Sequence, residues 1–159
     1  MRKRTYFLAR WRNEWPEPGE LERSFSTVTG REKLFASGLD GGSLVGEGLY
    51  GTENLEPYTG RVDVYLYFAA NPECGLSLQY TKWDGRQRRN ETYNSKGDLG
   101  RLNEFVRSFS GTPLSIGLFV QFDLGSKAIR EFIETDGELP TCIEWIANKD
   151  LPPGTFPDP

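Results

Sequence analysis

The stretch from residue 62 to residue 93 is the part of the sequence that most constrains the fold. Val62–Phe68 and Leu76–Tyr80 alternate apolar and polar residues with the two-residue period of β-strands. The dipeptide Asp84-Gly85 favours a tight hairpin turn, and the polar stretch Gln87–Tyr93 follows it as a return strand. The sequence therefore predicts an antiparallel meander.

The rest of the chain predicts further elements around this meander. Strands are expected at Thr5–Trp11, Phe25–Thr29, Leu114–Phe122 and Thr141–Ile146, the last as an inner strand. Helices are expected at Arg31–Leu39 with Thr29 as the cap, from Asp98 to Gly111, and after a capping Asp123 as far as Asp136-Gly137. The glycine-rich segment Gly38–Gly60 predicts a long loop or an irregular strand pair.

These elements predict one α+β domain, a mainly antiparallel sheet with two or three helices packed on it. The chain has 159 residues, which is an ordinary length for a single domain with its own core. We expect the domain to span residues 1–150 and residues 151–159 to form a proline-rich tail.

The chain contains no histidine, and this excludes the common nucleophile systems and the usual zinc sites. Its two cysteines, Cys74 and Cys142, lack the CxxC spacing of a metal or redox motif, and no phosphate-binding glycine loop is present. The sequence therefore predicts no catalytic residues, no metal and no cofactor, and we expect the protein not to be an enzyme.

A carboxylate enzyme is the alternative that histidine does not exclude, because glycoside hydrolysis needs only two acids at a suitable separation. The acids at 131, 134, 136 and 138 are the obvious candidates. They also fit the solvated face of a helix and the turn after it, which is the simpler interpretation.

Charge and the N-terminus indicate the compartment and the kind of partner. The net charge of −4 disfavours direct binding of nucleic acid and favours a basic partner. The N-terminus begins with basic residues, but Arg10 interrupts its apolar run too early for an export signal or a membrane helix. We expect a cytoplasmic protein with reduced thiols and no membrane contact.

A second alternative is a small non-enzymatic domain that binds nucleic acid or serves as another kind of protein-interaction domain. Trp83 lies close in sequence to Arg86, Arg88 and Arg89, and aromatic rings interleaved with basic residues can form a platform for single strands. An ordinary hairpin with its arginines in water and Trp83 over the turn explains the same pattern.

Residues 113–145 contain a helix that ends in a phenylalanine, a short glycine turn, a proline and a strand that reaches a tryptophan. The key positions are Phe132, Gly137, Pro140 and Trp145. This segment resembles the C-terminal signature of the Imm1 family of bacterial immunity proteins. We expect Phe132 to pack the helix on the sheet, Gly137 to end it in a left-handed conformation, Pro140 to fix the strand entry and Trp145 to fill the core.

The resemblance implies an immunity protein that binds a secreted toxin and occludes its active site. Members of the family are associated with nucleic-acid deaminase toxins, so the implied partner is a basic cytidine deaminase domain bound in a 1:1 complex. Acidic and aromatic residues in the glycine-rich segment and the neighbouring hairpin are the candidate contacts. They are Glu47, Tyr50, Glu53, Glu56, Tyr58, Trp83 and Asp84.

Overall fold

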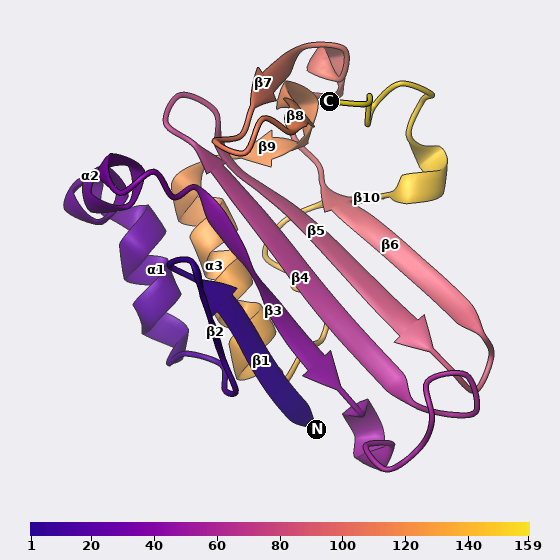
Figure 1. Cartoon of the computed structure of the whole chain (residues 1–159). Coiled ribbons are helices and arrows are strands. Elements are labelled where there is room, and N and C mark those ends of the chain that lie inside the picture. The colour runs from indigo at the N-terminus through magenta and orange to yellow at the C-terminus, as the bar shows by residue number, and fades with distance from the viewer.

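An eight-stranded antiparallel sheet forms the centre of the computed structural model, which describes residues 1–159 (Figure 1). Its strand order is β10-β6-β5-β4-β3-β1-β2, and β9 pairs with β5 beside this path. The strands are β1 (Arg2–Phe7), β2 (Arg10–Arg12), β3 (Gly41–Glu47), β4 (Val62–Asn71), β5 (Gly75–Asp84), β6 (Arg89–Ser95), β9 (Phe119–Val120) and β10 (Trp145–Ala147). A separate hairpin pairs β7 (Phe105–Arg107) with β8 (Pro113–Ser115).

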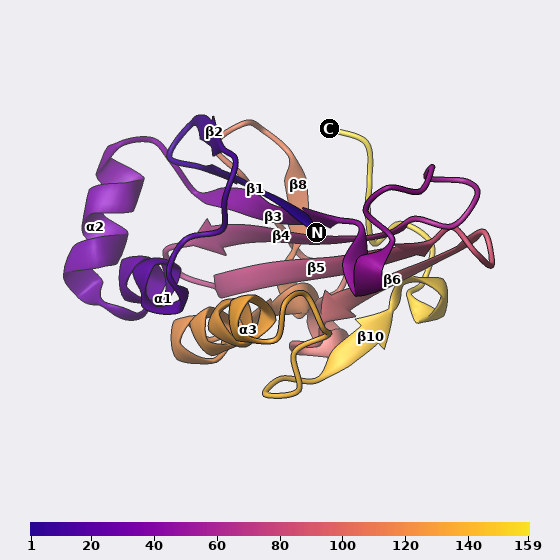
Figure 2. The ribbon, with the colours of Figure 1, turned by 90° about the horizontal axis from the view of Figure 1, so that it is seen from below.

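Three helices, α1 (Pro18–Ser26), α2 (Val28–Ala36) and α3 (Phe122–Glu134), complete the fold. Figure 2 shows α1 and α3 side by side against one face of the sheet, with β8 on the other side. Short 3-10 turns are η1 (Leu49–Gly51), η2 (Leu99–Arg101), η3 (Ile116–Leu118) and η4 (Asn148–Asp150). No helix has the length and apolar character that crossing a bilayer requires.

The core lies between the sheet and the helices. Alternate residues of β4, from Val62 to Ala70, turn their side chains toward the helices and are buried, as the two-residue period predicts. Leu21 and Phe25 of α1 and Phe132 of α3 are fully buried against them. Removing each such side chain from water stabilises the folded state by roughly 1.5–3 kcal/mol. The predicted α+β domain with helices on a mainly antiparallel sheet is therefore confirmed.

The meander is confirmed as β4, β5 and β6, and two of the three expected helices are present at shifted ends. The predicted helix at Arg31–Leu39 is α2, which begins at Val28 and is capped by Thr27 rather than Thr29. The Thr27 hydroxyl accepts a hydrogen bond from the Gly30 amide at 3.0 Å. Helix α3 begins one residue before Asp123, which lies in its first turn instead of at the cap.

The single strand predicted at Leu114–Phe122 is divided among β8, η3 and β9, and Phe122 already belongs to α3. Three other predicted elements are wrong. Phe25–Thr29 is not a strand, because Phe25 packs one helical turn after Leu21 in α1. The segment from Asp98 to Gly111 forms η2 and β7 rather than one helix, since β7 finds a partner in β8. Thr141–Ile146 is not an inner strand: β10 begins only at Trp145, and it pairs with β6 alone at the edge of the sheet.

The glycine-rich segment Gly38–Gly60 is only partly a loop. Its first part is β3, which pairs with β1 and β4. After Glu47 the chain leaves the sheet through η1 and returns at Val62. The predicted opening strand Thr5–Trp11 is likewise divided into β1 and β2 by a turn at Leu8 and Ala9, both with positive φ.

The four residues of the C-terminal signature all take structural roles. The Gly137 amide donates to the Phe132 carbonyl at 2.9 Å, and Gly137 itself has a φ of 96°, in the left-handed region. The Trp145 indole donates to the carbonyl of the buried Pro140 at 2.7 Å. Trp145 is only partly buried and packs on the core from its edge rather than filling it.

Candidate functional site

No helix covers the face of the sheet opposite α1 and α3, and the register arranges the side chains of this open face in cross-strand rows. From the upper end of the sheet in Figure 1 downward, these rows are Gly41, Ala69 and Ser77; Tyr6, Ser43, Tyr67, Gln79 and Asn94; Arg4, Val45, Tyr65, Thr81 and Thr92; and Arg2, Glu47, Asp63, Trp83 and Asn90. The first two rows carry no charged side chain. The open face thus has a neutral end and a charged end.

Asp63 anchors the charged end from a nearly fully buried position, 2% exposed. The single Nε–H of Arg61 is shared between the two oxygens of the Asp63 carboxylate, at 2.9 and 3.1 Å, and Arg61 Nη2 donates to Oδ2 at 3.0 Å. The same carboxylate accepts the Gly48 amide at 3.0 Å. These contacts fix both ends of the excursion from Gly48 to Arg61. Figure 1 shows this excursion and the β5–β6 turn at the same end of the sheet.

The predicted aromatic contacts lie at this end of the sheet but on its two sides. Trp83 belongs to the open-face row of Asp63, whereas Tyr50 binds Lys82, which is paired with the helix-facing Val64. The Tyr58 and Trp83 rings pack edge to face with centroids 5.6 Å apart, and the Trp83 indole donates to the Pro57 carbonyl. Tyr50 stands apart from them: its hydroxyl donates to Glu138 at 2.6 Å and accepts from Lys82 at 2.6 Å. Burial and the bond to Glu138 raise the pKa of the Tyr50 hydroxyl.

The predicted acidic contacts are mostly paired within the chain. Glu47 bonds to Arg2 and Arg4, Glu53 to the N-terminal amine, and Asp84 to Arg86. The amine lowers the pKa of Glu53, and Arg86 lowers the pKa of Asp84. Glu56 is exposed and forms no ion pair. The groups that this end offers to a partner are therefore chiefly the rings of Tyr50 and Tyr58, with the Glu56 carboxylate.

Two of the three hairpin arginines form ion pairs as well, and the third bonds to a backbone carbonyl. Arg86 bonds to Asp84, Arg89 to Glu91 at 2.8 Å, and Arg88 Nε donates to the Tyr58 carbonyl at 3.3 Å. The Trp83 ring lies against Tyr58 instead of standing free. A nucleic-acid platform needs free cations beside open rings, whereas two of these three arginines are in ion pairs and the Trp83 ring is covered by Tyr58, so the hairpin disfavours that alternative.

The carboxylates at the end of α3 and in the turn after it each have a structural partner. Glu131 accepts hydrogen bonds from the Thr141 amide and hydroxyl and from the Cys142 amide, at 2.7–3.1 Å. Glu134 pairs with Arg130, Asp136 with Lys3 and Glu138 with Tyr50. No group of three or more cysteine, aspartate or glutamate side chains is arranged to hold a metal ion.

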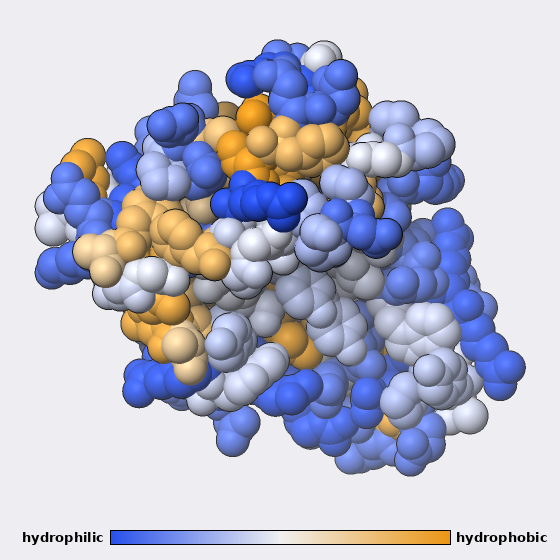
Figure 3. Space-filling view, turned by 45° about the horizontal axis from the view of Figure 1, so that its top comes forward, coloured by the Kyte–Doolittle hydropathy of each residue, from blue (hydrophilic) through white to orange (hydrophobic).

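A groove of about 840 Å³ lies at the neutral end of the open face, and the sequence analysis missed it. Its floor is the row of small residues Gly41, Ala69 and Ser77, and the loop from Ser108 to Thr112 walls one side. Phe156 and Pro157 of the C-terminal tail also line it. Figure 3 looks obliquely onto this face: a pale, hollowed band crosses it between orange apolar patches and a blue rim.

Comparisons of the chain with protein-family models, with curated proteins and with solved structures find no match in any of the three. The function must therefore be inferred from the residues of this chain.

Proposed function

We propose that this chain is an immunity protein that binds a secreted toxin in a 1:1 complex and occludes its active site. The toxin class that we propose is a nucleic-acid deaminase acting on cytidine, and the compartment is the cytoplasm of the producing cell. The proposal takes the toxin class from the resemblance of residues 113–145 to Imm1 proteins.

The observation that carries the proposal is the rigid presentation of the exposed Tyr58 ring at the charged end, with a second exposed ring, Tyr50, held at the same end of the sheet but beside its helix face. Tyr58 is 69% exposed, yet its backbone carbonyl is bound by Arg88 and its ring rests on Trp83. Tyr50 is 56% exposed and is held by two hydrogen bonds. Aromatic residues dominate the binding energy of interfaces, and a ring that is already ordered loses little entropy when a partner covers it.

The net charge of the protein also favours binding of a basic partner, but individual acidic side chains contribute less to this binding than the sequence alone suggests. The net charge of −4 favours approach to a basic cleft. Because Glu47, Glu53 and Asp84 are paired internally, affinity would come chiefly from the rings and from Glu56. Salt should therefore slow association more than it speeds dissociation.

Co-expression tests the proposal. We expect the neighbouring reading frame to encode a toxin domain, cells that express both chains to survive, and the two chains to elute as a 1:1 complex. Continued killing with no complex on a sizing column contradicts the proposal, as does a neighbouring frame that encodes no toxin.

Two variants locate the interface once a complex exists. Tyr58→Ala should weaken binding by about tenfold or more, as expected when an exposed aromatic anchor is lost. Phe156→Ala is the matched control, because Phe156 is 52% exposed but lies at the neutral end beside the groove. Equal effects of the two variants would contradict the assignment of the charged end.

A further inference from the structure

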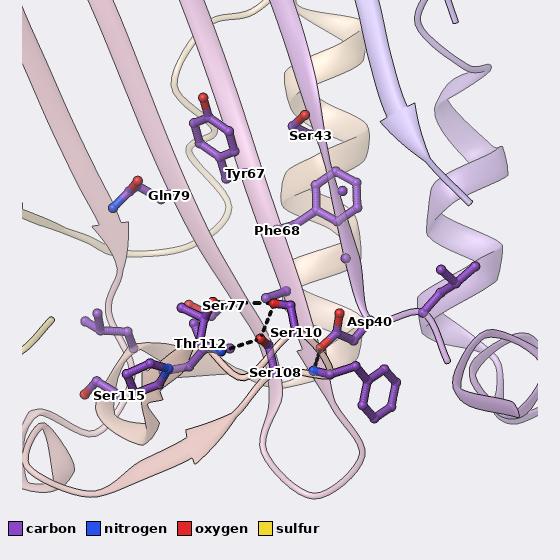
Figure 4. Close-up of a pocket in the computed structure, with 18 of the residues that line it drawn as sticks. Asp40, Ser43, Tyr67, Phe68, Ser77, Gln79, Ser108, Ser110, Thr112 and Ser115 are labelled. Atoms are coloured by element: carbon purple, nitrogen blue, oxygen red, sulfur yellow. Dashed lines mark hydrogen bonds between the residues drawn. The ribbon is translucent and has the colours of Figure 1, made fainter. Parts of the chain in front are cut away.

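The neutral groove is a built cavity with unused hydrogen-bonding groups. The hydroxyls of Tyr6, Ser43, Tyr67 and Ser77 line it and form no hydrogen bond within the protein. Ser43 is only 6% exposed. No fully buried side-chain polar atom in the chain lacks a partner, so these hydroxyls open onto the groove. Figure 4 shows Ser43, Tyr67 and Gln79 projecting from neighbouring strands.

Two further acceptors face the same space. Gln79 donates from Nε2 to Asn94 Oδ1 at 3.1 Å, and its own Oε1 accepts no hydrogen bond. Asp40 accepts the Phe109 amide at Oδ2, at 2.8 Å, and its second oxygen is unused (Figure 4). Across the groove, Ser108, Ser110 and Thr112 bond to one another and fix the loop. The site thus presents hydroxyl, amide and carboxylate groups on a stable frame.

The lining also restricts the charge of a ligand. It includes no lysine or arginine, and Asp40 is its only ionisable acid. A phosphate or carboxylate ligand would lose water without gaining a counter-charge and would meet Asp40, so anions are disfavoured. The Asp40 carboxylate is suited to accept hydrogen bonds from neutral hydroxyl groups.

Aromatic rings supply the apolar part of the surface. Tyr6, Tyr67, Phe109 and Phe156 line the groove, and each is between 38% and 54% exposed. A ligand that fits both sets of groups has many hydroxyls on its rim and apolar faces that cover aromatic rings. Pyranose rings have both properties, because their hydroxyls point outward and their C–H groups form flat apolar patches.

We propose that the neutral groove binds a short uncharged oligosaccharide. Its hydroxyls bond to Ser43, Gln79 and Asp40, and its C–H faces pack on Tyr67 and Tyr6. This site lies at the opposite end of the open face from Tyr58, and its occupancy does not depend on the proposed toxin.

Calorimetric and NMR titrations of the full chain with cellotriose, maltotriose and chitotriose test the proposal. We expect saturable binding of at least one of them, with amide shifts confined to the strands and loops that line the groove: β1, Asp40 and β3, β4, β5, the 108–112 loop and the tail around Phe156. Trigalacturonate, which is anionic, should not bind. The proposal is overturned if none of the three neutral sugars saturates at millimolar concentration, or if trigalacturonate binds as well as they do.

Variants separate the groove from the rest of the face. Tyr67→Ala and Gln79→Ala should each weaken sugar binding by about tenfold. Tyr65→Ala is the control, because Tyr65 stacks beside Tyr67 with its ring centroid 6.3 Å away but does not line the groove. Each variant should retain the wild-type melting temperature within a few degrees. Equal loss in Tyr65→Ala, or unchanged binding in Tyr67→Ala, places the sugar elsewhere and overturns the proposal.

Discussion

The Tyr80 hydroxyl donates a hydrogen bond to the Gly137 backbone carbonyl at 3.0 Å, and this contact joins the middle of the sheet to the turn after α3. The Tyr80 ring packs edge to face on Phe132 and Trp145, with centroids 6.1 and 6.4 Å apart. Burial raises the pKa of the Tyr80 hydroxyl, so it stays a donor at physiological pH. Three of the four residues of the C-terminal signature thus contact one strand residue, Tyr80.

Tyr80→Phe should lower the free energy of unfolding by about 1–2 kcal/mol, because the Gly137 carbonyl loses its buried donor while the packing is kept. Urea denaturation measures the change. Tyr93→Phe is the matched control, since Tyr93 lies opposite Tyr80 in the sheet and its hydroxyl makes no hydrogen bond. A loss in Tyr93→Phe as large as in Tyr80→Phe would show that the bond to Gly137 contributes nothing.

Gly137→Ala should cost about 2–3 kcal/mol, because the residue has a φ of 96° and an added Cβ would lie 2.8 Å from Val64 Cγ1. Gly111→Ala measures the cost of backbone strain alone, because Gly111 has a φ of 90° but an added Cβ there would meet nothing within 4 Å. We expect about 1 kcal/mol there. Thermal and urea unfolding compare the two variants, and equal costs would exclude the contact with Val64.

The fold could be predicted from the sequence where the local spacing of apolar residues is sufficient to distinguish a strand from a helix. The β4–β5–β6 meander and the buried face of α3 follow from hydrophobic spacing and from Asp84-Gly85. The strand predicted at Phe25–Thr29 was avoidable, because Pro18 and the i, i+4 pair Leu21 and Phe25 already favour a helix. The helix predicted from Asp98 failed for a different reason: β7 gains its stability from β8, a partner that local spacing does not reveal.

The candidate sites were predictable only in part. Sequence proximity placed Trp83 beside Asp84, and the structure adds Tyr58 to that group, while Tyr50 lies separately against Lys82. The internal pairing of Glu47 and Glu53 could not be read from the sequence, because their partners come from the N-terminus. The neutral groove depends on three small residues that only the strand register brings into one row.

Asp63→Ala should cost about 3 kcal/mol, because it leaves the largely buried Arg61 guanidinium without its carboxylate. It also removes one of the two acceptors of the Gly48 amide, which keeps its bond to the Val62 carbonyl at 2.9 Å. Hydrogen exchange of the Gly48 amide should accelerate together with that of the 48–61 excursion. Asp84→Ala breaks an exposed pair with Arg86 and should cost less than about 1 kcal/mol. An unchanged exchange rate at Gly48 in Asp63→Ala would contradict the anchoring role.

Glu131 should make the free energy of unfolding depend on pH in the acidic range. Burial acts to raise the pKa of its carboxyl, but hydrogen bonds from Thr141 and Cys142 outweigh this effect and lower the pKa from its ordinary value of 4.5. Because the pKa of Glu131 is lower in the folded state than in the unfolded state, its stabilising effect is complete at pH values above the ordinary pKa of 4.5. The effect is lost as the pH falls through the folded-state pKa. Glu131→Gln should therefore cost about 1 kcal/mol at pH 7, and the difference from wild type should shrink below about pH 4.

Denaturation midpoints between about pH 7 and pH 3 measure this difference. Glu134→Gln is the control on the same helix, because Glu134 contacts only the exposed Arg130. A gap between wild type and Glu131→Gln that stays constant, or widens, as the pH falls would contradict the role assigned to the Glu131 carboxylate.

Titration of the purified toxin domain with this chain tests the proposed function most directly, with deamination of cytidine in a nucleic-acid substrate as the readout. We expect activity to fall linearly and to vanish near one equivalent of the chain, with Tyr58→Ala requiring a clear excess. Undiminished deamination in the presence of a large excess of the wild-type chain would contradict the claim that this protein acts by occluding a partner's active site.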